Sequence, residues 1–435
     1  MLTAITRAFR TPDLRKKLLF TLGIIALFRL GSVLPTPGVN AENVRRCLEQ
    51  AQSSDAGNIY GMVQLFSGGA LLKLSVFALG IMPYITASII LQLLVVVIPR
   101  LEALKKEGQA GTAKITQYTR YLTIGLAILQ STAFIALART GQLFPQCQEE
   151  VLLNQEIFTI VTMVITMTAG TAVIMWLGEL ITDRGVGNGM SILIFTQVIA
   201  VFPSELLNIY RQSAFTFVAV MVVGIFMIAA VVFVEQAQRR VPVQYAKRMV
   251  GRRMYGGTST YIPLKVNQAG IIPVIFASSL LYLPQLVTTL FASAENPNVV
   301  VQWISEHLVT GDTPVYMATF FLLIVFFTYF YVSITFNPVE VADNMKKYGG
   351  FIPGIRPGRP TAEYLNYVLT RLTAPGALYL GLISMVPIVA LAVAGASQNF
   401  PFGGTSILIM VGVGLDTVKQ IESQLQQRNY EGFLK

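Results

Sequence analysis

The chain has 435 residues, of which 54% are hydrophobic and only 12% are charged, and its formal net charge is +10. Soluble domains carry about 25% charged residues, so a water-soluble fold of this size could not bury so much apolar surface. The composition therefore excludes the ordinary soluble classes and predicts a protein that crosses the membrane several times.

Ten apolar runs have about the 20 residues that a helix needs to cross a bilayer. We expect spans at 16–34, 75–98, 115–137, 157–180, 190–208, 215–234, 267–290, 315–336, 374–394 and 404–424. The basic segment before the first run has no convincing small-residue cleavage site after it, which predicts a retained span rather than a signal peptide.

Basic residues are distributed very unequally between the two sides of this ten-span arrangement. The side that holds both termini carries 26 of the 32 Lys and Arg residues. The positive-inside rule then places the N- and C-termini in the cytoplasm. That rule alone accounts for most of these charges. The loops at about 236–266 and 337–373 also mix basic residues with Gly, Pro and aromatic residues, which suits docking to an anionic partner such as ribosomal RNA or an acidic motor surface.

The stretch from Gly57 to Pro83 contains a short apolar piece, 59–66, that is closed by Ser67, Gly68 and Gly69. Eight residues are too few to cross a bilayer. The piece is either a half-helix that acts as a movable stopper or an interfacial helix on the outer surface, and the residues alone favour the second. Irregular backbone at membrane depth must be buried in protein or line a watery cavity.

The predicted spans contain few groups that could carry out chemistry. Arg29 lies in the first span, and Lys73 and Glu179 lie near span ends. Ion-coupled transporters usually keep carboxylates or histidine at mid-depth, which disfavours that class. Five spans on either side of residue 208 nevertheless fit an inverted repeat, so an ion-coupled secondary transporter of small solutes stays as the alternative. We find no catalytic pair within the spans and no phosphate-binding loop, and therefore expect no enzyme activity, no cofactor and no metal site.

Six motifs along the chain resemble the SecY family, which forms the channel of the bacterial Sec translocon. They are LGIMPYITASIILQLL (79–94), TDRGVGNGMSILIF (182–195), RRVPVQYAKR (239–248), IPLKVNQAGIIPVIFASS (262–279), FNPVEVADNMKKYGGFIPGIRPG (336–358) and FGGTSILI (402–409). The resemblance covers essentially the whole chain, apart from the outer loop 35–56 and the C-terminal tail. It implies an all-α polytopic fold of ten transmembrane helices, in two pseudo-symmetric inverted halves (1–208 and 209–435), around an hourglass pore with a short plug helix at about 59–72.

The same resemblance implies four sets of functional residues. The pore ring would be formed by Ile81, Ile85, Met190, Ile194, Ile275 and Ile409. The plug would include Tyr60, Met62, Val63, Leu65, Phe66, Gly68 and Gly69. A lateral gate would be held by hydrogen bonds of Thr86, Gln130 and Asn267, and SecA or the ribosome would bind Arg240, Lys247, Arg248, Arg252 and Arg356.

The family's function follows as an expectation. The chain would passively translocate unfolded secretory proteins across the bacterial plasma membrane and insert membrane proteins laterally into it. SecA or the ribosome would supply the driving force. Expected partners are SecE, SecG, the SecA ATPase, the ribosome, signal sequences, nascent polypeptides and phospholipid. We expect no direct DNA binding, whereas the basic cytosolic loops could contact ribosomal RNA.

Both cysteines, Cys47 and Cys147, fall on the predicted outer side. Oxidation is chemically permitted there. The sequence leaves open whether they pair, and two unrelated thiols are favoured over a disulfide.

Overall fold

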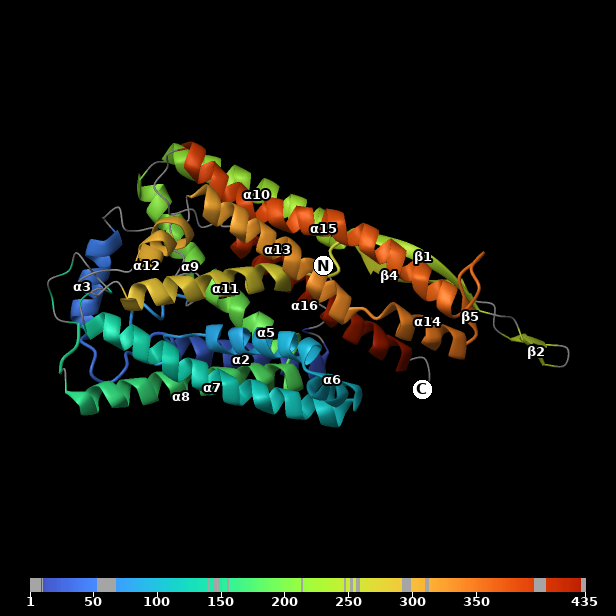
Figure 1. Ribbon diagram of the computed structural model, residues 1–435, viewed down its shortest axis with the longest axis horizontal. Coiled ribbons are helices and arrows are strands. Elements are labelled where there is room, and N and C mark those ends of the chain that lie inside the picture. Colours follow the sequence, from blue (N-terminus) through green and yellow to red (C-terminus); the bar gives the residue numbers. More distant parts are fainter. Residues whose placement is uncertain are drawn as a thin grey trace.

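The computed structural model describes residues 9, 11–52, 68–139, 141, 143, 147, 149, 151–154, 156–212, 214–245, 248–250, 253–255, 259–291, 299–309, 313–394 and 404–431. Most of these residues are helical, and the longest helices run along the long axis of the molecule (Figure 1). Helices α3 and α12 lie at one end, and the strands and α14 lie toward the other.

The first half of the chain contributes the helices up to residue 212. They are α2 (Pro12–Gly31), α3 (Ala41–Gln52), α5 (Met82–Val97), α6 (Pro99–Lys106), α7 (Gln109–Arg139), α8 (Ile157–Arg184) and α9 (Gly189–Gln212). Helix α5 bends by 99° into α6 at Ile98, where Pro99 follows. The residue before a proline is driven away from helical angles, and Ile98 is accordingly extended at ψ 110°.

The second half continues with helices of similar length and adds the strands. Its helices are α10 (Ala214–Gln236), α11 (Ile272–Phe291), α12 (Val299–Ile304), the π-helix η1 (Ser305–Val309), α13 (Pro314–Thr335), α14 (Pro338–Lys347), α15 (Arg359–Ala394) and α16 (Gly404–Glu431). Its strands are β1 (Gln238–Tyr245), β2 (Arg248–Val250), β3 (Arg253–Tyr255), β4 (Ser259–Lys265) and β5 (Gly350–Phe351).

Each predicted span coincides with a helix, although some ends were placed wrongly. Among the described residues, six helices are each apolar and long enough to cross a membrane, and the bent pair α5–α6 would make a seventh. The second span begins as helix only at Met82, not at residue 75. Helix α15 begins at Arg359 rather than at 374, because its first turns pack outside the apolar stretch, where Leu365 and Leu369 are buried against the strands.

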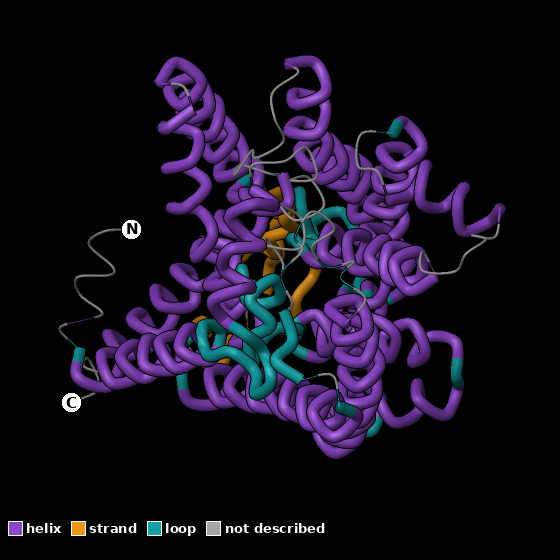
Figure 2. Tube along the Cα trace, turned by 90° about the vertical axis from the view of Figure 1, so that its left-hand side faces the viewer, coloured by secondary structure: helices purple, strands orange, loops and turns teal. Residues whose placement is uncertain are grey.

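The two halves of the chain meet on two sides of the bundle. Helix α11 packs against α5 and α7, and on another side α9 packs against α10 and α16. Viewed from the end that carries α3, the helices surround a central group of loops (Figure 2). Large apolar side chains on α10 such as Phe226, which is 74% exposed, point outward, as expected where lipid is the solvent.

Two loops that are far apart in the sequence form one platform. Strand β1 pairs with β4 on one side and with β5 on the other, both antiparallel. Val241 and Leu264 of the sheet, and Ile352 just after β5, are buried with Leu365 and Leu369 of α15. The basic loops at 236–266 and 337–373 are therefore packed together rather than being independent protrusions.

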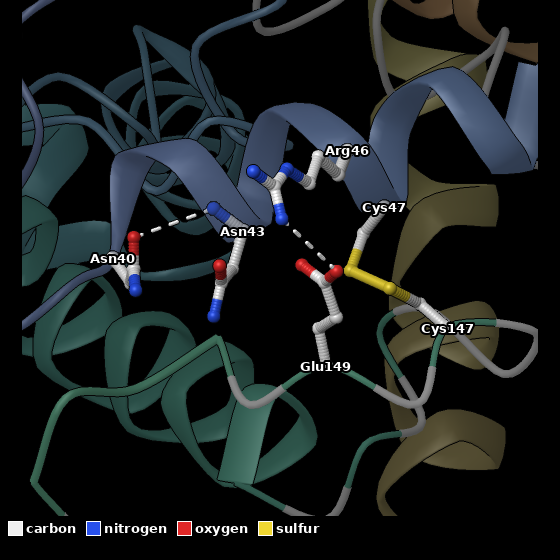
Figure 3. The surroundings of a disulfide bond; sticks show 6 residues. All are labelled: Asn40, Asn43, Arg46, Cys47, Cys147 and Glu149. Atoms are coloured by element: carbon white, nitrogen blue, oxygen red, sulfur yellow. Dashed lines mark hydrogen bonds and ion pairs between the residues drawn. A yellow bond between two sulfur atoms is a disulfide. The ribbon is translucent and has the colours of Figure 1, made fainter.

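A disulfide joins Cys47 of α3 to Cys147 in the connection between α7 and α8 (Figure 3), with a Cα–Cα distance of 5.3 Å. Our expectation of two unrelated thiols was therefore wrong. The pairing follows from neighbouring backbone contacts, because Asn40 N–H donates to Val151 O at 2.9 Å and Val39 bridges Leu152. An ion pair between Arg46 and Glu149, at 3.5 Å, lies beside the bond. No sequence pattern signals these contacts between distant loops.

Candidate pore and lateral seam

The expected pore ring begins where the backbone of the second span becomes helical. Ile81 is the residue before α5, Pro83 lies in its first turn, and Ile85 N–H donates to Ile81 O at 3.1 Å. Proline suits this turn because its missing N–H would have no intrahelical acceptor there. Ile81 and Ile85 lie one turn apart and are both buried.

The structure brings all six expected ring residues into one apolar cluster. Ile81, Ile85, Ile194, Ile275 and Ile409 are buried members of the cluster. Met190, on the same helix as Ile194, packs against its edge. These residues come from four helices of both halves, namely α5, α9, α11 and α16.

A cavity of about 540 Å³ opens beside this cluster. Its apolar lining includes four ring residues: Ile85, Met190, Ile194 and Ile275. Ile81 and Ile409 do not line it and lie within the packed cluster. The cavity therefore borders four of the six expected ring residues, and the other two are packed in the apolar cluster beside it.

The rest of the cavity wall mixes polar side chains with the apolar Ile272 and Phe276. It includes Ser88 and Gln92 of α5, Thr116 of α7 and Asn188 before α9. Such a wall holds water, whereas an aliphatic constriction expels it. The arrangement can hydrate a polar chain down to the ring and exclude ions at the ring.

An ion pair that we did not predict crosses this wall. Arg120 of α7 donates from Nε and Nη2 to the two carboxylate oxygens of Glu179 on α8, at 2.9 and 2.8 Å. Such two-pronged pairs fix geometry as well as charge. The two residues are 59 positions apart in the chain, and this spacing gives no sequence signal.

The three expected gate residues lie on the elements that meet at the α5/α7–α11 contact. Thr86 lies on α5, Gln130 on α7, and Asn267 just before α11, and all three are buried. Among the described residues, no hydrogen bond joins any two of them. Thr86 donates to Met82 O in its own helix, and Asn267 donates to Glu235 and to Gly270 O. We call the contact of α11 with α5 and α7 the lateral seam.

The segment before α5, residues 68–81, is irregular and mostly buried. Thr36 Oγ1 donates to Leu74 O at 2.7 Å, and Val76 N–H donates to Leu34 O at 2.9 Å. These bonds satisfy backbone groups that helical structure would otherwise satisfy. Leu74 has a positive φ of 45°, which is uncommon outside glycine. Hydropathy predicted helix from residue 75 because it cannot separate a buried irregular run from a helical one.

The expected plug falls mostly outside the described residues. Gly68 and Gly69 are described and both have positive φ, 63° and 79°, as expected of a glycine turn. Arg29 Nη1 donates to Gly68 O at 3.4 Å. The remaining expected plug residues, Tyr60, Met62, Val63, Leu65 and Phe66, lie outside the part of the chain that the structure describes.

The expected docking arginines lie on the exposed side of the platform. Arg240 of β1 is exposed, and its guanidinium sits 4.8 Å from the ring centroid of Tyr261. Arg356 is exposed on a turn where Gly354 and Gly358 have positive φ. Lys247 and Arg252 lie outside the described residues, as does the side chain of Arg248.

Among the side chains that the structure describes, Glu235 at the end of α10 is the buried charged residue. It is 8% exposed and lies just beyond the end of the predicted span 215–234. Within the same described part of the chain, no group of three or more His, Cys, Asp or Glu could hold a metal ion.

Comparison with known proteins identifies what this arrangement resembles. The SecY family model matches residues 75–418. The protein translocase subunit SecY of Streptomyces galbus is 68% identical over 442 residues, covering 100% of both chains. Two solved structures share the fold at low identity: a protein-conducting channel (19% identity, TM-score 0.64) and Sec61 in a canine ribosome–channel complex (18%, TM-score 0.61). Each match covers 94% of this chain and 91% of the other.

Proposed function

The chain belongs to the SecY family, and from that premise we propose that it is the channel-forming subunit of a bacterial protein translocase. The observation that carries the proposal is that aliphatic side chains at the start of α5 and on α9, α11 and α16 belong to one apolar cluster, beside a cavity whose wall also carries polar side chains. A dry constriction of this kind blocks ions when it is empty. Around a threading polypeptide, the same flexible side chains make the seal.

The pore ring and the lateral seam have separate roles in this proposal. The ring consists of Ile81, Ile85, Met190, Ile194, Ile275 and Ile409. It admits a polypeptide of any sequence and excludes ions, because its side chains fit around the chain and exclude water. The lateral seam, with Thr86, Gln130 and Asn267, parts to let an apolar segment reach lipid. Such a segment gains about 0.3 to 0.6 kcal/mol for each central Leu or Ile that enters the bilayer. Sorting between secretion and insertion is then a partition equilibrium.

The chain is a channel subunit rather than an enzyme, so the driving force must come from partners. We propose that the platform faces the cytoplasm, with both termini on that side, in the plasma membrane. Its exposed Arg240 and Arg356 would bind acidic surfaces of SecA or ribosomal RNA phosphates. SecE and SecG would complete the membrane complex, and the plug at about 59–72 would close the outer side.

The deciding experiment uses the full-length chain, purified with its partner subunits and reconstituted in vesicles with SecA. ATP should drive an unfolded precursor protein into a protease-protected space. The alternative, an ion-coupled transporter, predicts accumulation of a small solute down an ion gradient without SecA. Solute accumulation in the absence of precursor transport would refute the channel.

A further inference from the structure

A buried carboxylate at the end of α10 contacts the turn that starts α11. Glu235 is 8% exposed, and its Oε1 accepts a hydrogen bond from Asn267 Nδ2 at 2.6 Å. The same Nδ2 donates to Gly270 O at 3.1 Å. Asn267 is 2% exposed, and its Oδ1 has no hydrogen-bond partner among the described residues. Both of these hydrogen bonds are therefore donated by Asn267 Nδ2, and the bond to the Glu235 carboxylate is the shorter of the two.

The turn between β4 and α11 is also held from two further sides. Val266 N–H donates to Ala237 O at 3.0 Å, just after α10. On the α15 side, a Cβ added at Gly376 would come within 2.6 Å of Val266 O, so the two backbones approach closely. Helix α11 begins at Ile272, one turn before Ile275. The position of Ile275 therefore depends on the turn that Asn267 anchors.

Other charges lie near Glu235 but do not replace this contact. Lys265, Asp416 and Lys419 are within electrostatic range of its carboxylate. Lys265 Nζ and Asp416 Oδ1 form an ion pair at 3.4 Å, and both side chains are well exposed. An exposed ion pair contributes little to structure. A hydrogen bond to a buried carboxylate contributes more, because loss of one partner leaves a desolvated group.

We propose that Glu235 is a positioning residue of the channel. It holds Asn267, and through Asn267 it sets the start of α11 and the depth of Ile275 in the pore ring. Asn267 then anchors a turn within the second half of the chain. The family resemblance had instead suggested a hydrogen bond of Asn267 across the lateral seam. The inference rests on the proposed channel function for its readout, which is the ion leak of the resting pore.

Moving the acid from position 235 to position 267, and the amide in the opposite direction, tests the pair. N267D puts two carboxylates in contact in a buried site, and we expect the resting conductance in planar bilayers to rise about tenfold or more. E235Q keeps an amide oxygen as the acceptor and should stay within about twofold of wild type. The double variant E235Q/N267D restores an amide-to-carboxylate hydrogen bond with the acid on the other partner. Neither variant that carries N267D can donate from this side chain to Gly270 O, so the conductance of the double variant should fall well below that of N267D without reaching the wild-type value. D416N, which breaks the exposed ion pair with Lys265, is the matched control and should not leak.

A leak in the exchanged double variant as large as in N267D, or no leak in an N267D channel of normal yield, would overturn the proposal. If N267D does not accumulate in membranes, accumulation of the double variant decides instead: recovery supports the pair, and failure to recover refutes it. Precursor transport by the wild-type channel is measured in parallel. If the wild-type channel transports the precursor but the double variant shows no rescue, only the role of Glu235 is refuted and the channel function stands.

Discussion

The close approach of α8 to the irregular segment before α5 predicts a large effect of one methyl group. A Cβ added at Gly170 would lie 2.0 Å from Val76 O and 3.2 Å from the Phe77 ring. The carbonyl belongs to the backbone, and Val76 N–H is bonded to Leu34 O, so the contact cannot be relieved by a side-chain rotation. Overpacking of this kind costs about 1–3 kcal/mol. The better helix propensity of alanine returns about 0.5–1 kcal/mol, so the net loss for Gly170→Ala should be up to about 2.5 kcal/mol, and about 1 kcal/mol at the centre of both ranges.

The matched control is the same substitution at Gly125 of α7, where an added Cβ meets no atom within 4 Å. Gly125→Ala should be neutral or slightly stabilising. Thermal unfolding of the purified protein in detergent measures both variants. The resting conductance measures whether displacement of the segment reaches Ile81, a few residues further along the chain. Equal stability of the two variants would refute the close approach, and with it the packing that we assign to residues 68–81.

Three further predictions concern the ring, the platform and the disulfide. Replacing Ile275 and the two α5 ring residues with glycine should make the resting channel conduct ions, and unchanged conductance would refute the ring. Arg356→Glu should reduce SecA-driven transport while membrane insertion of the chain stays normal, and normal transport would remove this turn from the docking surface. Replacing Cys47 and Cys147 with alanine should lower the thermal midpoint, because the disulfide restricts the unfolded chain. The two cysteines are 100 residues apart, and closing a loop of this length stabilises the fold by at most about 4.7 kcal/mol. A reductant should lower the wild-type midpoint and leave the double variant unchanged, and an equal effect on both would show that the disulfide does not stabilise the protein.

The membrane spans were predictable because lipid imposes a simple length and composition. The prediction failed at the start of the second span, where the chain is apolar and buried but not helical. Residues 75–81 are as apolar as a span, but their backbone bonds are not helical: Val76 N–H donates to Leu34 O, and Ala78 and Gly80 N–H donate within the segment. Helix α15 extends beyond the bilayer because its first turns cover a sheet, and β1 pairs with both β4 and β5 across a long sequence separation.

The ring could be proposed from motifs because its residues are spaced by helical turns within recognisable strings. The groups around it could not. Arg120 and Glu179 meet across 59 residues, and Asn267 bonds Glu235 from a different helix. Each of these pairs is local in space and distant in sequence, so no periodicity points to it. Only the packing of α7 on α8, or of the turn before α11 on α10, brings the partners together.

Formation of the disulfide also depends on the order in which the helices enter the membrane. Between Cys47 and Cys147 the chain passes through α5 and α7. In the topology proposed above, the bond can close only after both helices have entered the bilayer and the second cysteine has reached the outer side. Pulse-labelled chains that acquire the bond have completed their first three crossings, so a shift in gel mobility would time an early stage of biogenesis.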